Sequence, residues 1–170
     1  SVARAIIANV LALSYRQGFS TLTQQLARNL YDTIGFKKTV TRKIKEIITA
    51  IQIEKTYTKD EILEMYLNSV HFGHGTYGVQ AAAKRYFSKD AKDLSIDECA
   101  LLVGLLPAPA RYSPIRHPER AFVRRNTVLR LMHDQKYITD AVYVEARSTD
   151  LQNIQKDQFR GTAPYFTEYI

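Results

Sequence analysis

The 170-residue sequence has few residues that cross-link or interrupt a chain: one cysteine, seven glycines, five prolines and no tryptophan. The single Cys99 excludes an internal disulfide framework and a zinc site built from cysteines. Because it lies in the apolar run 99–106, we expect a buried, unreactive thiol. The scarcity of glycine and proline favours long regular elements over a strand-and-turn architecture.

Long apolar runs are also missing. No uninterrupted stretch approaches the roughly 18 apolar residues of a membrane span, so we predict no transmembrane helix in this sequence. Ser1 leads directly into an apolar-rich segment, with neither an initiator methionine nor a signal-peptide pattern. We therefore expect the chain to be a piece of a longer protein.

The residues that are present have the balance of a globular domain, with 45% hydrophobic and 24% charged side chains. A chain of this length can build one domain with a real core. The formal charge of +7 points to an anionic partner, which could be nucleic acid, a phosphorylated ligand or an acidic membrane surface. Charge alone does not choose among these partners, and a basic surface without a specific ligand fits equally well.

Apolar periodicity and helix-start signals predict an all-α domain of about seven or eight helices, without a convincing alternating strand. Three helix starts resemble capping boxes, at Thr21, Thr58 and Ser95. The expected helices cover residues 2–13, 20–30, 42–57, 58–68, 79–87, 95–106, 118–133 and 139–147.

The helix expected over 42–57 has the clearest pattern. Its isoleucines form an apolar stripe, made of Ile44, Ile47, Ile48 and Ile51. Residues 31–41 have no apolar period and read as a loop.

Glu46 follows Arg42 by four residues and Lys43 by three, so both cations can lie beside it on one helix face. Such neighbours would keep the carboxylate ionised and would orient it. The plainer alternative is a solvent-exposed face with ordinary ion pairs, and the spacing by itself favours that alternative.

A cluster of hydrogen-bonding side chains surrounds the helix start at residues 20–29. Its members are Ser20, Thr21, Thr23, Gln24, Gln25, Arg28 and Asn29. Backbone N–H groups and the Arg28 guanidinium could hold a phosphate there. A polar helix with a good cap explains the same residues, so both interpretations stay open.

Two further patterns are weaker evidence for a functional site. The glycine segment 71–78 lacks the signature of a P-loop or a dinucleotide site, and its two histidines are a poor metal signal without a third ligand. A tight turn where backbones pass closely explains it better. The basic face with Arg124, Arg125 and Arg130 could contact a phosphate or a helix terminus, although simple solvent exposure is the favoured interpretation.

Taken together, these segments resemble the peptidoglycan glycosyltransferases of class A penicillin-binding proteins and monofunctional transglycosylases. Residues 20–29 resemble the second signature motif of that family. Residues 42–68, 73–87 and 124–129 are similar to the third, fourth and fifth motifs, in the same order. The resemblance extends from residue 1 to about residue 147.

The resemblance implies a mainly α-helical, lysozyme-like domain with two lobes, the smaller of which faces the membrane. It implies lipid II, a disaccharide-pentapeptide on a polyprenyl diphosphate, as the substrate. In the implied reaction a sugar 4-hydroxyl attacks the anomeric carbon at the lipid-linked end of the growing strand. That carbon is inverted, a β-1,4 linkage forms, and polyprenyl diphosphate is released.

The family's functional positions can be carried over to this sequence. Gln25 and Arg28 match donor-binding positions, with Arg28 where lysine is usual, and Lys38 or its neighbour Lys37 matches a further cation. Glu46 matches the second essential glutamate, which is expected to orient cations and donor rather than to act as the base. The remaining expected substrate contacts are Ser20, Thr21, Asn29, Arg42 and Lys43.

The family's general base is a glutamate of the first motif, which this sequence lacks and which would precede Ser1. Residues 1–170 by themselves are therefore expected to be nearly inactive. The resemblance assigns residues 1–150 to the glycosyltransferase domain, while 151–170 lead toward a linker or transpeptidase domain. No cofactor is firmly implied, although Mg²⁺ or Mn²⁺ could assist the diphosphate.

The expected partners are lipid II, the growing glycan strand and the membrane surface, and not nucleic acid. The expected location is the extracytoplasmic face of the bacterial inner membrane, with an anchor upstream of Ser1. Two other functions are compatible with parts of the sequence: a lysozyme-like glycan-cleaving enzyme and a basic helical nucleic-acid-binding module. Glycan cleavage needs paired carboxylates but no cations for a diphosphate, and nucleic-acid binding does not explain four ordered motifs.

Overall fold

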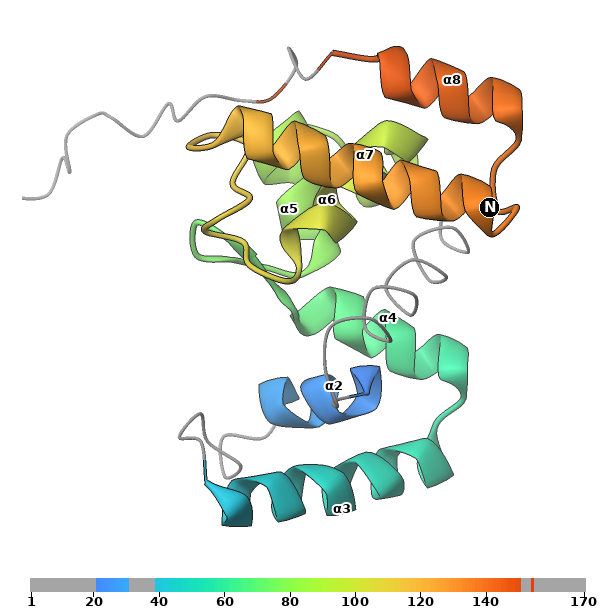
Figure 1. Cartoon of the computed structure of the whole chain (residues 1–170). Helices are drawn as coiled ribbons and strands as arrows, with labels where there is room; N and C mark the ends of the chain where they lie inside the picture. The colour runs from blue at the N-terminus through green and yellow to red at the C-terminus, as the bar shows by residue number, and fades with distance from the viewer. Residues whose placement is uncertain (1–20, 31–38, 151–153, 155–170) are drawn as a thin grey trace, which may run out of the picture.

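The structure is a computed structural model that describes residues 21–30, 39–150 and 154 (Figure 1). These residues form a mainly helical domain, which confirms the all-α prediction. The helix expected over 2–13 and most of the tail 151–170 lie outside the described residues. The elements are α2 (Leu22–Leu30), α3 (Val40–Thr56), α4 (Lys59–Ser69), β1 (His71–Gly73), β2 (Thr76–Tyr77), α5 (Val79–Phe87), η2 (Ala91–Asp93), α6 (Ile96–Leu105), α7 (Pro118–Asp134) and α8 (Asp140–Ser148).

The helices form two groups (Figure 1). In the first group α2 packs against both α3 and α4, and in the second group α6 packs against α7, which also contacts α8. The chain passes from α4 to α5 through the short β1–β2 hairpin. Within the part of the chain that the structure describes, no helix is both long enough and apolar enough to cross a membrane.

Helix starts follow the predicted capping signals closely. Thr58 and Ser95 form capping boxes with Glu61 and Glu98, because each side chain binds the other residue's backbone N–H. Of the loop predicted over 31–41, residues 31–38 lie outside the described residues, and the prediction is wrong for the last two residues, which belong to α3. Thr39 accepts the N–H of Arg42 and caps α3, so the helix begins at Val40.

The sequence predicted no convincing strand, but five of the described residues form two short strands. Strands β1 and β2 pair antiparallel, with His71 opposite Tyr77 and Gly73 opposite Thr76. Strands this short cannot show the alternation that marks a strand in a sequence. The predicted tight turn is confirmed at Gly78, whose φ is +84° and where an added Cβ would lie 2.7 Å from the Asn68 carbonyl oxygen.

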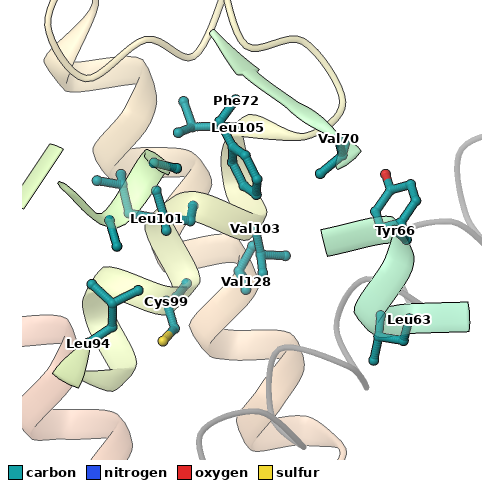
Figure 2. Close-up of a cluster of buried hydrophobic side chains, with 14 of the residues drawn as sticks. Leu63, Tyr66, Val70, Phe72, Leu94, Cys99, Leu101, Val103, Leu105 and Val128 are labelled. Carbon is teal, nitrogen blue, oxygen red and sulfur yellow. The ribbon is translucent and has the colours of Figure 1, made fainter. Parts of the chain in front are cut away.

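A single apolar cluster joins the two groups of helices. Figure 2 shows part of it, with Tyr66 from α4, Phe72 from β1, Leu101 from α6 and Val128 from α7. Cys99 lies within this cluster, as predicted, and burial raises the pKa of its thiol to about 12. The thiol is therefore protonated and unreactive at neutral pH.

The isoleucine stripe of α3 faces outward. Ile44, Ile48 and Ile51 are 53%, 52% and 49% exposed, whereas the buried side chains of the helix are Glu46, Ala50 and Ile53. An amphipathic helix usually turns its apolar stripe toward the core. Here α2 packs against α3, and the buried face includes a glutamate.

Candidate functional site

Helix α2 has one apolar side and one polar side. Leu26 and Ala27 are fully buried, whereas the side chains of Gln24, Gln25 and Arg28 are partly exposed. Thr21 directly precedes the helix, and its hydroxyl accepts the N–H of Gln24 at 3.2 Å. Residues three or four positions apart lie on the same helix face, so Gln25 and Arg28 are neighbours.

The neighbouring helix α3 buries one carboxylate, that of Glu46, between two cations. Its side chain is only 1% exposed, and its carboxylate lies 2.7 Å from Lys43 Nζ and 3.6 Å from Arg42 Nη1. Both predicted ion pairs therefore form, but the solvent-exposed alternative for Glu46 is wrong. Removing one partner of a buried ion pair costs about 3–5 kcal/mol because the other charge stays desolvated.

In the part of the chain that the structure describes, two cations, Arg42 and Lys43, lie beside the one carboxylate of Glu46. Within the described residues, the buried Nε of Arg42 has no hydrogen-bond acceptor. The cluster thus combines two cations with an N–H donor that has no acceptor among the described residues. Such a combination suits an anion that carries several oxygen acceptors.

Lys43 connects α3 to α2. Its Nζ donates to Gln24 Oε1 at 2.7 Å and, at the same length, to Glu46 Oε1. The ammonium group is therefore shared between the two helices. This contact places the polar side of α2 next to the buried carboxylate of α3.

Tyr66 of α4 contacts α2 from another direction and is not among the predicted site residues. Its hydroxyl donates to Gln25 Oε1 at 3.3 Å, and its ring is buried. Burial raises the pKa of Tyr66 to about 12, while the charge of Arg28 acts in the opposite direction. A buried tyrosine hydroxyl needs a partner, but the sequence could not identify one 41 residues away.

The predicted site residues are thus brought together in part. Gln25, Arg28 and Asn29 lie on α2, and Arg42, Lys43 and Glu46 lie on the first turns of α3, which packs against α2. Thr21 lies at the helix start and acts there as a cap. The predicted contacts Ser20, Lys37 and Lys38 lie outside the described residues.

A cavity of about 530 Å³ lies near the start of α2, but it is separate from the charge cluster. Its charged lining residues are Glu54, Asp60 and Lys59, and none of Gln25, Arg28 and Glu46 lines it. Two carboxylates against one ammonium group leave the lining negative, which disfavours an anionic ligand. The basic cluster of α2 and α3 is therefore the better anion site.

The two histidines of the glycine segment have separate neighbours. His71 packs against the Tyr77 ring, and His74 Nε2 lies 2.9 Å from the buried Ser113 hydroxyl. The part of the chain that the structure describes contains no group of three or more His, Cys, Asp or Glu side chains that could hold a metal ion.

Arg125 contradicts the favoured prediction of solvent exposure for its helix face. Its side chain is fully buried, and Nη1 and Nη2 donate to the carbonyl oxygens of Thr149 and Arg147 at 2.7 and 3.2 Å. These carbonyls lie at the end of α8, so the alternative of a neighbouring helix terminus is confirmed for this residue. Burial lowers the pKa of Arg125, and Asp97 and Asp150 oppose that effect.

The sequence is similar to known proteins along its whole length. The transglycosylase family matches residues 1–133. The chain is 46% identical over its full length to Penicillin-binding protein 1F of Bacillus subtilis, and covers 23% of that protein. It is 47% identical over 98% of its length to Penicillin-binding protein 1A of Vibrio cholerae, and covers 20% of that protein.

A solved structure is also similar. The crystal structure of Penicillin-binding protein 1A from Haemophilus influenzae matches 64% of this chain with a TM-score of 0.56 and 40% sequence identity. The match covers 16% of that chain and agrees with the predicted lysozyme-like helical fold class. This chain therefore spans less than a quarter of the length of these similar proteins.

Proposed function

Because the chain belongs to the transglycosylase family, we propose that it is the glycosyltransferase domain of a bacterial cell-wall synthase that polymerises lipid II. The reaction joins the 4-hydroxyl of one disaccharide to the anomeric carbon at the lipid-linked end of the strand. The bond from that carbon to the diphosphate oxygen breaks, the carbon is inverted, and polyprenyl diphosphate leaves. A glycan-cleaving enzyme and a nucleic-acid-binding module are disfavoured by the family match.

The observation that carries this proposal is the buried Glu46 between Arg42 and Lys43, next to the polar side of α2. A leaving diphosphate gains negative charge in the transition state and needs cations and N–H donors around it. The cations Arg42 and Lys43 and the guanidinium of Arg28 would supply them. The amide groups of Gln24 and Gln25 would add neutral donors.

In this proposal Glu46 orients the cations and is not the base. Its carboxylate is nearly inaccessible and already bound by two cations, so an incoming sugar hydroxyl could not reach it easily. A general base must lie within hydrogen-bond reach of the proton that it takes. The proton therefore goes to a different group, for which the first-motif glutamate expected upstream of Ser1 is our candidate.

The exposed face of α3 supports the proposed contact with a membrane surface. Ile44, Ile48 and Ile51 project from this helix, and the exposed Lys45 lies beside them in the sequence. An apolar helix face flanked by cations is suited to the interface of an anionic bilayer, where each cation contributes about 1 kcal/mol. Vesicle sedimentation tests this contact, since Ile48→Asp should weaken binding and unchanged binding would contradict it.

Other parts of the proposal concern the parent protein and its surroundings. We place the domain at the extracytoplasmic face of the inner membrane, in a chain that also carries a transpeptidase domain. The similar proteins are named penicillin-binding proteins, and binding of penicillin fits a transpeptidase domain in such a chain.

The described residues do not fit a protein-held divalent cation, because they contain no suitable cluster and Glu46 is already paired. An assisting Mg²⁺ or Mn²⁺ would be held by the diphosphate oxygens, which Mg²⁺ favours. A chelator should then slow polymerisation in a way that added Mg²⁺ reverses.

Polymerisation of lipid II in detergent tests the proposed function directly. The assay uses the full-length chain, including the sequence upstream of Ser1, and compares Glu46→Gln with Glu54→Gln. Glu54 is an exposed carboxylate on the same helix and serves as the matched control. We expect Glu46→Gln to lower the rate about 100-fold or more, because Arg42 and Lys43 would no longer be held in position for the diphosphate, and Glu54→Gln to leave it unchanged. Equal rates for both variants would refute the assignment.

A further inference from the structure

The two consecutive glutamines of α2 are held by different helices. The Gln24 carboxamide oxygen accepts a hydrogen bond from Lys43 of α3, and the Gln25 oxygen accepts one from Tyr66 of α4. Both bonds use the oxygen of the carboxamide, which leaves the two N–H groups of each amide for other acceptors. The sequence does not reveal this arrangement, because it depends on how α2, α3 and α4 pack together.

The Tyr66 hydroxyl is well suited to fix the orientation of the Gln25 carboxamide. The ring is 3% exposed and belongs to the apolar cluster, so the position of the hydroxyl is set by packing. With a pKa of about 12, the phenol keeps its proton at neutral pH and stays a donor. The distance of 3.3 Å is long for an O–H···O bond, as is common at sites that tighten when a ligand binds.

Arg28 lies close enough for its charge to act on the Tyr66 hydroxyl. Gln25 and Arg28 are also neighbours on the same face of α2. A phosphate oxygen bound by the Arg28 guanidinium would therefore be near the Gln25 amide. The direction in which that amide presents its N–H groups then matters for binding.

We propose that Tyr66 is a positioning residue for the leaving diphosphate, which holds the Gln25 carboxamide by its oxygen and turns the amide N–H groups toward the phosphate. This inference rests on the proposed lipid II transfer, since it assigns a phosphate to the polar side of α2. Tyr66 touches neither the sugar nor the reacting carbon in this proposal, and acts only through Gln25.

A purely structural role is the competing explanation. A buried hydroxyl must find some acceptor, and Gln25 could serve that need without any consequence for the ligand. In that case loss of the hydroxyl would lower stability and leave turnover unchanged. The two explanations thus differ in the kinetics and in the dependence on Gln25.

The test compares Tyr66→Phe, Gln25→Met and the double variant in the full-length chain, with Tyr86→Phe as the matched control. Tyr86 is also buried and donates its hydroxyl to a protein oxygen, the Phe72 carbonyl at 2.8 Å, but it lies on α5. For lipid II polymerisation we expect Tyr66→Phe to lower kcat about fivefold with little change in KM, the size expected for one neutral hydrogen bond. Tyr86→Phe should leave kcat unchanged.

The double variant decides between the explanations. If Tyr66 acts through Gln25, Tyr66→Phe should cost nothing further once Gln25 is methionine. The inference is overturned if Tyr66→Phe lowers only the melting temperature, or if it lowers kcat equally in both backgrounds.

Binding of farnesyl diphosphate, measured by calorimetry on the same variants, separates this inference from the proposed function. A wild-type chain that makes no polymer would refute lipid II transfer. Weaker diphosphate binding by Tyr66→Phe, but not by Tyr86→Phe, would still support the positioning role. Unchanged binding in both variants would overturn it.

Discussion

Two fully buried charged side chains, Glu46 of α3 and Arg125 of α7, are stabilised by different kinds of partner. Arg125 donates to the carbonyls of Thr149 and Arg147 and to the Asn126 side chain, so its partners are backbone or adjacent groups of the second helix group. Glu46 is held by two long cationic side chains of its own helix.

The difference separates a structural charge from a functional one. The donors of Arg125 are used by the protein itself, and the end of α8 depends on them. The cations around Glu46 outnumber it, and Lys43 is partly exposed, so this cluster can still interact with an anion. Burial alone therefore does not separate a structural charge from a functional one. The two differ in whether the surrounding cations and N–H donors are already used by the protein.

The largest effect on stability should come from Arg125→Met, which keeps a long apolar side chain but removes every donor. Carbonyls at the end of α8 would lose their partners, and we expect a loss of about 3 kcal/mol in the free energy of unfolding. In a domain of this size that loss corresponds to a fall of about 6–12 °C in melting temperature. Differential scanning calorimetry checks this, with Arg130→Met, an exposed arginine of α7, as control.

The polymerisation rate, unlike the stability, should hardly change in Arg125→Met. At a temperature where it is folded, Arg125→Met should polymerise lipid II at nearly the wild-type rate. A large loss of turnover in fully folded protein would contradict a purely structural role for Arg125.

A smaller effect, and one on turnover, is expected for Lys43. Lys43→Met removes both the contact to Gln24 and one ion pair of Glu46, so we expect about a tenfold loss of kcat/KM. Lys43→Arg keeps the charge with a different geometry and should recover part of the loss. Steady-state polymerisation kinetics provide the measurement, and Lys55→Met, at an exposed position of α3, is the control. The interpretation is wrong if Lys43→Met and Lys55→Met behave alike.

The smallest effect should come from Asn126→Ala. The Asn126 side-chain oxygen accepts from Arg125 Nε and Nη2 at 3.2 and 3.1 Å, while the carbonyl contacts of Arg125 remain in the variant. We expect a loss of about 1 kcal/mol in urea unfolding, with turnover unchanged. A loss as large as that of Arg125→Met would show that the side-chain amide, and not the helix end, is the main partner.

Much of the local structure was predictable because its causes are local. Thr58 and Glu61 lie three residues apart and cap α4 through their own side chains, so the helix start is visible in the sequence. The same is true of Glu46 with Arg42 and Lys43, whose spacing predicts contact on any helix. Recognition of the family then supplied the predicted substrate and the roles of Gln25 and Arg28, which stay predictions.

Other features were not predictable because they depend on contacts between distant segments. The isoleucine stripe of α3 has the pattern of a core-facing surface, and only the position of α2 shows that the opposite face is buried. Arg125 looked exposed because the end of α8, more than 20 residues further along the chain, supplies its acceptors.

By itself, the sequence determined the helices, their caps and the spacing that pairs Glu46 with two cations, because hydrogen bonds and ion pairs within one helix depend only on neighbours in the chain. The tertiary structure decided which charges are buried, that Lys43 connects α3 to Gln24, and that Tyr66 reaches Gln25. These features depend on desolvation and on side chains brought together from different helices, and neither is set until the helices pack.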